Sequence, residues 1–195
     1  MAGTCRAGRR KRASAVIAGF ARKLPGLLLS GLFLYTASSP VLCADPVSLE
    51  YEVKAAFLFN FTKFVQWPSS AFADANSAFE ICIVGDDPFG KTLDDIVQGE
   101  SVDGHRISIQ RIQVGQQQRC HVLYSGKNLP PQTATEAGSA VLTVGDGTNF
   151  VHDGGIIGFI LEDRRIRFDI NLRAATNAGL KMSSRLLTVA RYVER

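Results

Sequence analysis

The residues from Gly85 to Thr92, GDDPFGKT, spell G-x-x-x-x-G-K-[ST], the pattern of a phosphate-binding loop. They follow an apolar segment that predicts a strand at 79–85, and they open a helix predicted at about 89–98, as such a loop requires. A loop of this kind binds the phosphates of ATP or GTP through consecutive backbone N–H groups. The spelling alone therefore indicates a nucleotide hydrolase.

Two chemical features of the same segment argue against that function. Pro88 has no N–H to offer to a phosphate oxygen. Asp86 and Asp87 place two negative charges where a triphosphate would lie. We therefore expect an ordinary strand-to-helix turn and no bound nucleotide, and we keep the P-loop hydrolase only as an alternative of a different class.

Cys82 and Cys120 each lie in an apolar run that predicts a strand, FEICIV and RCHVLY. A disulfide between them would close a loop of about 38 residues and stabilise the fold by roughly 3–4 kcal/mol. Two buried free thiols are the alternative. His121 follows Cys120 directly, and neighbours on a strand point to opposite faces, so we expect His121 opposite the bridge and no metal site.

No other motif predicts catalysis. The sequence contains no G-x-S-x-G nucleophile motif, and no spacing isolates two carboxylates as an acid–base pair. We therefore expect a protein that is not an enzyme and that has no cofactor. The acidic side chains are expected at caps, turns and solvated strand faces: Asp146, Asp153, Glu162, Asp163 and Asp169.

The predicted elements alternate between strands and helices after an opening helix. We predict an α/β three-layer sandwich around a mixed, mostly parallel sheet, with an N-terminal helix and a C-terminal hairpin plus helices. The hairpin would turn tightly at Asp163-Arg164. The predicted helices are 49–66, 89–98, 133–138, 171–178 and 183–192, and the predicted strands are 79–85, 106–113, 120–125, 140–144, 156–162 and 165–171.

The first 44 residues read as a secretory signal, and residues 45–195 as one domain. The leader has seven basic and no acidic residues, an apolar run from Leu24 to Ala37, and small residues before a cleavage site after Ala44. An uncleaved membrane anchor is the alternative, but the run is shorter than the ~20 residues that span a bilayer. Without the leader, 15 basic and 18 acidic residues give a net charge of −3, so the charge predicts no nucleic-acid partner.

The segment from Tyr51 to Pro68, YEVKAAFLFNFTKFVQWP, predicts a helix that is apolar around most of its circumference. It resembles the opening helix of the YfiR family of small secreted bacterial proteins. The segment from Gly154 to Val193, GGIIGFILEDRRIRFDINLRAATNAGLKMSSRLLTVARYV, resembles the closing block of that family. The resemblance spans roughly residues 50–193.

The resemblance implies a periplasmic negative regulator. Such a protein binds the periplasmic domain of an inner-membrane diguanylate cyclase, YfiN, and so lowers cyclic di-GMP and disfavours biofilm. It also implies disulfides, which favours the Cys82–Cys120 bridge, and a homodimer as one state. The alternative function is a periplasmic small-molecule-binding accessory protein of another sensor system.

Two surfaces are candidates for partner binding. One is a part of the opening helix that we expect to be exposed, and the other is a charged strand face with the turn that follows it. On that strand face a half-buried alternating strand is the structural alternative. The candidate residues are Lys54, Phe59 and Lys63 on the helix and Arg165, Arg167 and Asn171 on the strand and turn.

Overall fold

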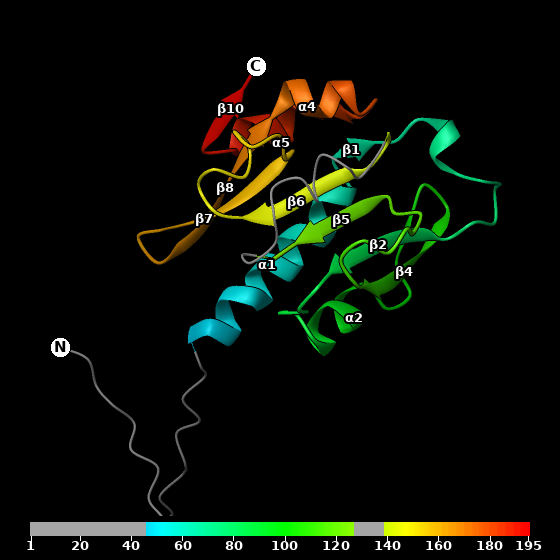
Figure 1. The fold of residues 1–195 in the computed structure, drawn as a ribbon, viewed down its shortest axis with the longest axis horizontal. Helices are drawn as coiled ribbons and strands as arrows, with labels where there is room; N and C mark the ends of the chain where they lie inside the picture. The colour runs from blue at the N-terminus through cyan, green and yellow to red at the C-terminus, as the bar shows by residue number, and fades with distance from the viewer. Residues whose placement is uncertain (1–45, 127–138) are drawn as a thin grey trace, which may run out of the picture. The chain divides into compact units, whose positions relative to one another are not determined.

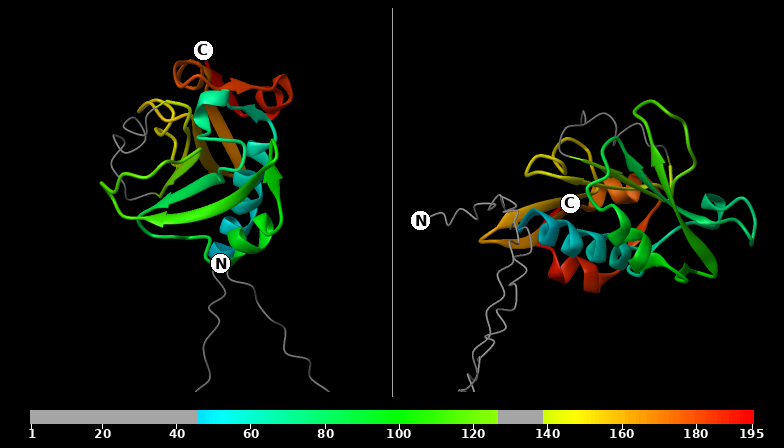
Figure 2. Two further views of the ribbon diagram at one scale, coloured as in Figure 1. Left: turned by 90° about the vertical axis from the view of Figure 1, so that its right-hand side faces the viewer. Right: turned by 90° about the horizontal axis from the view of Figure 1, so that it is seen from below.

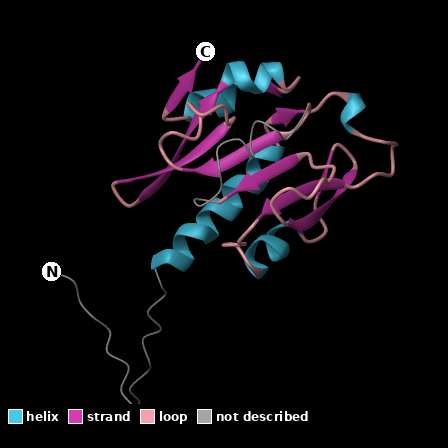
Figure 3. Ribbon diagram, viewed as in Figure 1, coloured by secondary structure: helices cyan, strands magenta, loops and turns pink. Residues whose placement is uncertain are grey.

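The computed structural model describes residues 46–126 and 139–195, and their central feature is a mixed, mostly parallel sheet with flanking helices (Figures 1 and 3). This confirms the predicted fold class. The predicted leader and the helix predicted at 133–138 lie outside the described residues. The helices are α1 (Pro46–Thr62), η1 (Ser69–Ala71), α2 (Lys91–Val97), α4 (Leu172–Asn177) and α5 (Ser184–Val189). The strands are β1 (Val65–Gln66), β2 (Phe79–Val84), β3 (Ser101–Val102), β4 (His105–Ile112), β5 (Val122–Ser125), β6 (Leu142–Asp146), β7 (Ile157–Glu162), β8 (Arg165–Asn171), β9 (Lys181–Met182) and β10 (Tyr192–Glu194).

The eight-stranded sheet has the order β10-β8-β7-β6-β5-β2-β4-β3. The strands β4, β2, β5, β6 and β7 are parallel, and β7 and β8 form the predicted antiparallel hairpin. Asp163 and Arg164 at its turn both have positive φ, 49° and 60°. Two such residues form the turn that matches the twist of the flanking strands. Because β2, β5 and β6 are parallel neighbours, their carboxyl ends meet at one edge of the sheet.

Helices α1 and α2 lie together on one face of the sheet, where the main core forms (Figure 2). Aromatic rings of α1 pack against rings of the hairpin: the centroids of Phe61 and Phe168 are 5.0 Å apart, and those of Phe57 and Phe168 are 5.7 Å apart. Alternation along each strand sends every second side chain to this face. The position of α1 over the sheet is thus fixed by aromatic burial, which contributes roughly 1.5–3 kcal/mol per large side chain.

The other face of the sheet carries a second, smaller apolar cluster that includes Cys82, Val84, Leu123 and Val141. Helix α4 stands beside this face, where it lines a cavity of about 510 Å³ together with Val141 and Thr143. No helix among the described residues is long and apolar enough to cross a membrane.

Four short strands were not predicted, and one of them, β3, pairs antiparallel with β4. β1 pairs with β9 antiparallel, and β10 pairs with β8 in parallel through Tyr192 and Asp169. The helix predicted at 183–192 ends early, because the backbone N–H of Arg191 donates to the carbonyl of Phe168 and starts β10. Strands of two or three residues have too few positions for a hydrophobic period to be recognised.

Candidate functional site

A buried group of polar side chains lies at the carboxyl ends of β5 and β6, beneath α1. Lys54 projects from α1, and its Nζ lies 2.7 Å from Asp146 Oδ1 at the end of β6 and 2.5 Å from Glu50 Oε1 one helical turn earlier. The hydroxyl of Tyr124, near the end of β5, donates to Asp146 Oδ2 at 2.8 Å, and that of Tyr51 lies 3.4 Å from the same oxygen. We call these five residues the Lys54 network.

Burial and charge act on the Lys54 network in opposite directions. Desolvation lowers the pKa of Lys54, but its hydrogen bonds and attraction to Asp146 and Glu50 outweigh desolvation and raise that pKa above the usual lysine value. Burial raises the pKa of Tyr124, and the Asp146 carboxylate raises it further. The lysine therefore stays charged and the phenol stays protonated, so each fits the acceptor that it contacts.

The Lys54 network occupies the place where open α/β sheets usually bind ligands, outside the carboxyl ends of parallel strands. In this protein a side chain of α1 fills that ligand position. The Lys54 side chain is 2% exposed, and that of its partner Asp146 in β6 is 1% exposed. The Lys54 ammonium also lies 4.6 Å from the centre of the Tyr51 ring. The arrangement therefore holds the first half of α1 against the sheet and presents no open reactive group.

Four members of the Lys54 network were missed from the sequence as site residues: Asp146, Tyr124, Glu50 and Tyr51. A usable signal existed, since Tyr124 and Asp146 lie near the ends of two predicted neighbouring strands. The carboxyl ends of parallel strands meet at one edge of a sheet. Glu50 precedes Lys54 by four residues, which places both on one face of a helix.

The expectation that Lys54 and Phe59 belong to an exposed surface is wrong. Lys54 is 2% exposed and Phe59 is 8% exposed. Because α1 has apolar side chains on most of its sides, the sheet and neighbouring segments cover most of this helix. Lys63 is exposed, with its ammonium 4.2 Å from the centre of the Phe59 ring. Val53 of α1 is 38% exposed, so this helix is not buried around its whole circumference.

On β8, Arg165 and Arg167 are exposed as expected. Neither forms an ion pair with another described residue, whereas Arg191 pairs with Asp169 through two hydrogen bonds. Asn171 was expected on the same partner-binding surface, but it is 5% exposed and caps the N-terminus of α4. The structure thus separates two exposed arginines from a buried helix cap.

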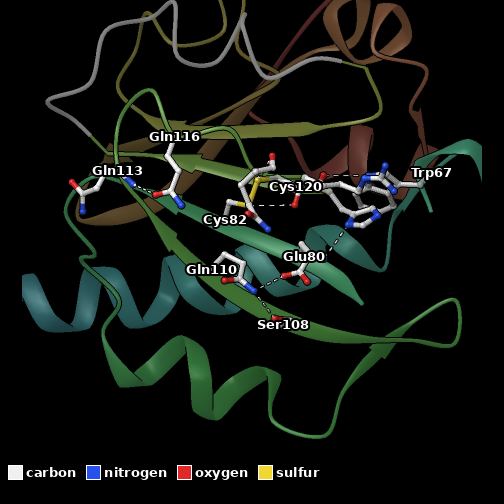
Figure 4. The surroundings of a disulfide bond; sticks show 11 residues. Trp67, Glu80, Cys82, Ser108, Gln110, Gln113, Gln116 and Cys120 are labelled. Atoms are coloured by element: carbon white, nitrogen blue, oxygen red, sulfur yellow. Dashed lines mark hydrogen bonds between the residues drawn. A yellow bond between two sulfur atoms is a disulfide. The ribbon is translucent and has the colours of Figure 1, made fainter. Parts of the chain in front are cut away.

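Cys82 and Cys120 are joined by a disulfide, with their Cα atoms 5.8 Å apart (Figure 4). This confirms the predicted pair. The bond lies on the face of the sheet away from α1, beside a cavity of about 700 Å³. Val84, Leu123 and Val141 contribute apolar side chains to the cavity. Four glutamines also line it: Gln113, Gln116, Gln117 and Gln118.

The loop after β2 uses its N–H groups internally. The backbone N–H groups of Phe89 and Gly90 donate to Asp87 Oδ1 at 2.8 and 3.1 Å, and Arg111 Nε donates to Asp87 Oδ2 at 2.7 Å. The Lys91 side chain is 83% exposed and pairs with Asp95 on its own helix. An aspartate of the chain therefore accepts two backbone N–H groups of the loop, and these donors are not free for a phosphate.

A family model described as YfiR/HmsC-like matches residues 51–191 of the chain. Among curated proteins, none matches it. Among solved structures, the chain is similar to a conserved domain protein from Vibrio cholerae O1 biovar El Tor strain N16961, at 13% sequence identity and a TM-score of 0.44. The match covers 74% of this chain and 60% of that one, so the chain spans less than two thirds of the Vibrio protein.

Proposed function

We propose that this chain, which belongs to the YfiR/HmsC-like family, is a periplasmic negative regulator that binds the periplasmic domain of an inner-membrane diguanylate cyclase and so lowers cyclic di-GMP. One observation carries the proposal: the family match extends from Tyr51 to Arg191, over almost all of the domain. The family is regulatory rather than catalytic. The closed Lys54 network supports binding over catalysis, because its polar groups already contact one another.

The docking surface that we propose is the outer part of the β7–β8 hairpin around Arg165 and Arg167. The turn of this hairpin points away from α4 (Figure 1). Arginine is one of the residue types that dominate interface energies. Both guanidinium groups are exposed, so a partner can reach them without unfolding the hairpin. Lys63 is a second exposed candidate, at the opposite end of α1 from the Lys54 network.

The first experiment deletes the gene in a strain whose diguanylate cyclase is intact and measures cyclic di-GMP. We expect the level to rise, and re-expression of the parent protein should restore it. An unchanged level after clean deletion would reject the regulatory function.

The second experiment locates the surface. Arg165→Glu and Arg167→Glu should weaken capture of the purified periplasmic domain of the cyclase while leaving the thermal melt unchanged. Arg185→Glu, an exposed position on α5, is the matched control and should bind like the parent. If the three variants bind equally well, the hairpin is not the docking surface.

A small-molecule-binding accessory function is the second candidate, and the cavity beside the disulfide is the observation that favours it. Its volume of about 700 Å³ falls in the range of small-molecule sites, and it combines apolar and amide side chains. This candidate predicts that Leu123→Trp, which fills the cavity, abolishes a ligand-induced rise in melting temperature. The regulator proposal predicts that cyclase capture survives the same substitution.

A further inference from the structure

His121, just before β5, joins three parts of the domain through its backbone. Its N–H donates to the carbonyl of Glu80 in β2 at 2.8 Å. Its carbonyl accepts from the backbone N–H of Leu142 in β6 at 2.8 Å and from Trp67 Nε1 at 3.2 Å. A change at His121 is therefore transmitted to two central strands and to the residue that follows β1.

The imidazole of His121 is held in its neutral form by the direction of one hydrogen bond. The backbone N–H of Glu80 donates to Nδ1 at 2.9 Å, so Nδ1 must carry a lone pair and the ring proton must be on Nε2. Nε2 is buried and forms no hydrogen bond of normal geometry with a described residue, although the backbone carbonyl of Ala71 attracts its proton. A buried donor without a partner is costly, and a positive charge on this ring would cost more.

Several charged or titratable groups act on this ring. Burial is the largest influence and lowers the pKa of His121, and electrostatic repulsion by His105 and Arg119 lowers it further. The backbone carbonyl of Ala71 and the carboxylate of Glu80 act in the opposite direction without reversing the shift. The neutral ring is thus the form that the fold favours near neutral pH.

The ring also anchors the segment from Trp67 to Ser77, which crosses the end of the sheet. Phe72 of this segment stacks on His121 with centroids 4.7 Å apart, and on His105 with centroids 3.8 Å apart. His121 stacks in turn on Phe79 of β2 at 4.8 Å. The segment is therefore held by a column of alternating histidine and phenylalanine rings.

The two histidines of the column respond differently to a proton. His105 Nδ1 lies 2.7 Å from the carbonyl of Ser77, which can only accept, so this nitrogen already carries a hydrogen. Protonation of His105 keeps that bond and adds a favourable cation–π contact with Phe72. Protonation of His121 instead places an N–H at Nδ1 against the N–H of Glu80, so that bond must break.

We propose that His121 is an acid-operated release for the segment from Trp67 to Ser77. A proton added to Nδ1 breaks the Glu80 bond and leaves a charge in a buried site. Cation–π contacts with Phe72 and Phe79 do not offset that cost, so the ring leaves the column and the end of the segment near Trp67 detaches. The pKa of histidine in the unfolded chain is about 6.5, and the pKa of His121 in the folded protein is lower. The neutral ring therefore contributes its full stabilisation above about pH 6.5, and this stabilisation is lost as the pH falls through the folded pKa.

The chain has a single tryptophan, Trp67, so its fluorescence reports on this site alone. In the purified exported protein we expect one fluorescence transition with a midpoint below about pH 6.5, while far-ultraviolet circular dichroism stays unchanged. His121→Asn should abolish the transition, because Asn Oδ1 can accept from Glu80 but does not titrate. His105→Asn should keep it.

Nuclear magnetic resonance keeps the test valid if His121→Asn does not fold. The chain has three histidines, so their imidazole signals can be assigned and titrated in the parent protein. The His121 titration should coincide with the fluorescence transition and with loss of hydrogen-exchange protection at the Glu80 amide. The proposal is overturned if His121 stays neutral until the whole domain unfolds, or if it titrates while Trp67 and the Glu80 amide do not respond.

Discussion

The Lys54 ammonium of α1 lies 2.7 Å from the carboxylate of Asp146 at the end of β6, and both side chains are almost completely buried. Lys54→Met should therefore lower the free energy of unfolding by about 3–5 kcal/mol, because it leaves the buried carboxylate of Asp146 without its cation. Denaturant unfolding at neutral pH measures this loss. Glu50→Gln should cost much less, since the Glu50 side chain is 15% exposed and Asp146 remains paired.

The same pair can be tested for coupling. The double variant Lys54→Met/Asp146→Asn removes both charges, so we expect it to be more stable than Lys54→Met alone. Additive losses in the two single variants would show that Lys54 and Asp146 do not act as a pair.

The Cys82–Cys120 disulfide should be formed in exported protein and should stabilise the domain. Replacing both cysteines by serine should lower the free energy of unfolding by about 2–5 kcal/mol, since the bridge constrains the unfolded chain. Intact-mass analysis after alkylation, with and without reductant, checks the bond itself. Two thiols that alkylate freely in native, unreduced protein would contradict it.

Local patterns predicted those parts of the fold that depend on neighbouring residues. The apolar runs around Cys82 and Cys120 predicted strands, and Asp163-Arg164 predicted a tight hairpin turn, since both signals lie within a few residues. Lys54 was misplaced because a helical period treats a lysine as a solvent-facing residue. Its partner Asp146 is 92 residues away in the sequence, so no local pattern reports that it is buried.

The loop from Gly85 to Thr92 should bind neither ATP nor GTP, because Asp87 already accepts the N–H groups of Phe89 and Gly90. Isothermal titration with each nucleotide and Mg²⁺ should give no measurable heat. Micromolar binding that Lys91→Ala abolishes would instead establish a phosphate site. Asp87→Ala should lower the free energy of unfolding by about 1–2 kcal/mol, because two backbone donors lose their acceptor.

Asn171 should affect stability and not docking, although the sequence made it a candidate for partner binding. Its Oδ1 accepts from the backbone N–H of Ala174 at 2.8 Å, and its Nδ2 donates to the carbonyl of Val151 at 2.9 Å. Asn171→Ala removes both bonds and should cost about 2–3 kcal/mol of unfolding free energy.

Asn171→Ser separates the two bonds of this side chain, because the serine hydroxyl can still cap α4 but cannot reach Val151. We expect it to lose about half as much stability as Asn171→Ala. Denaturant unfolding gives both values, and capture of the periplasmic domain of the proposed cyclase partner should be measured well below each melting temperature. If Asn171→Ala weakens capture there as strongly as Arg165→Glu does while folding remains intact, Asn171 is a contact residue and its role as a cap is secondary.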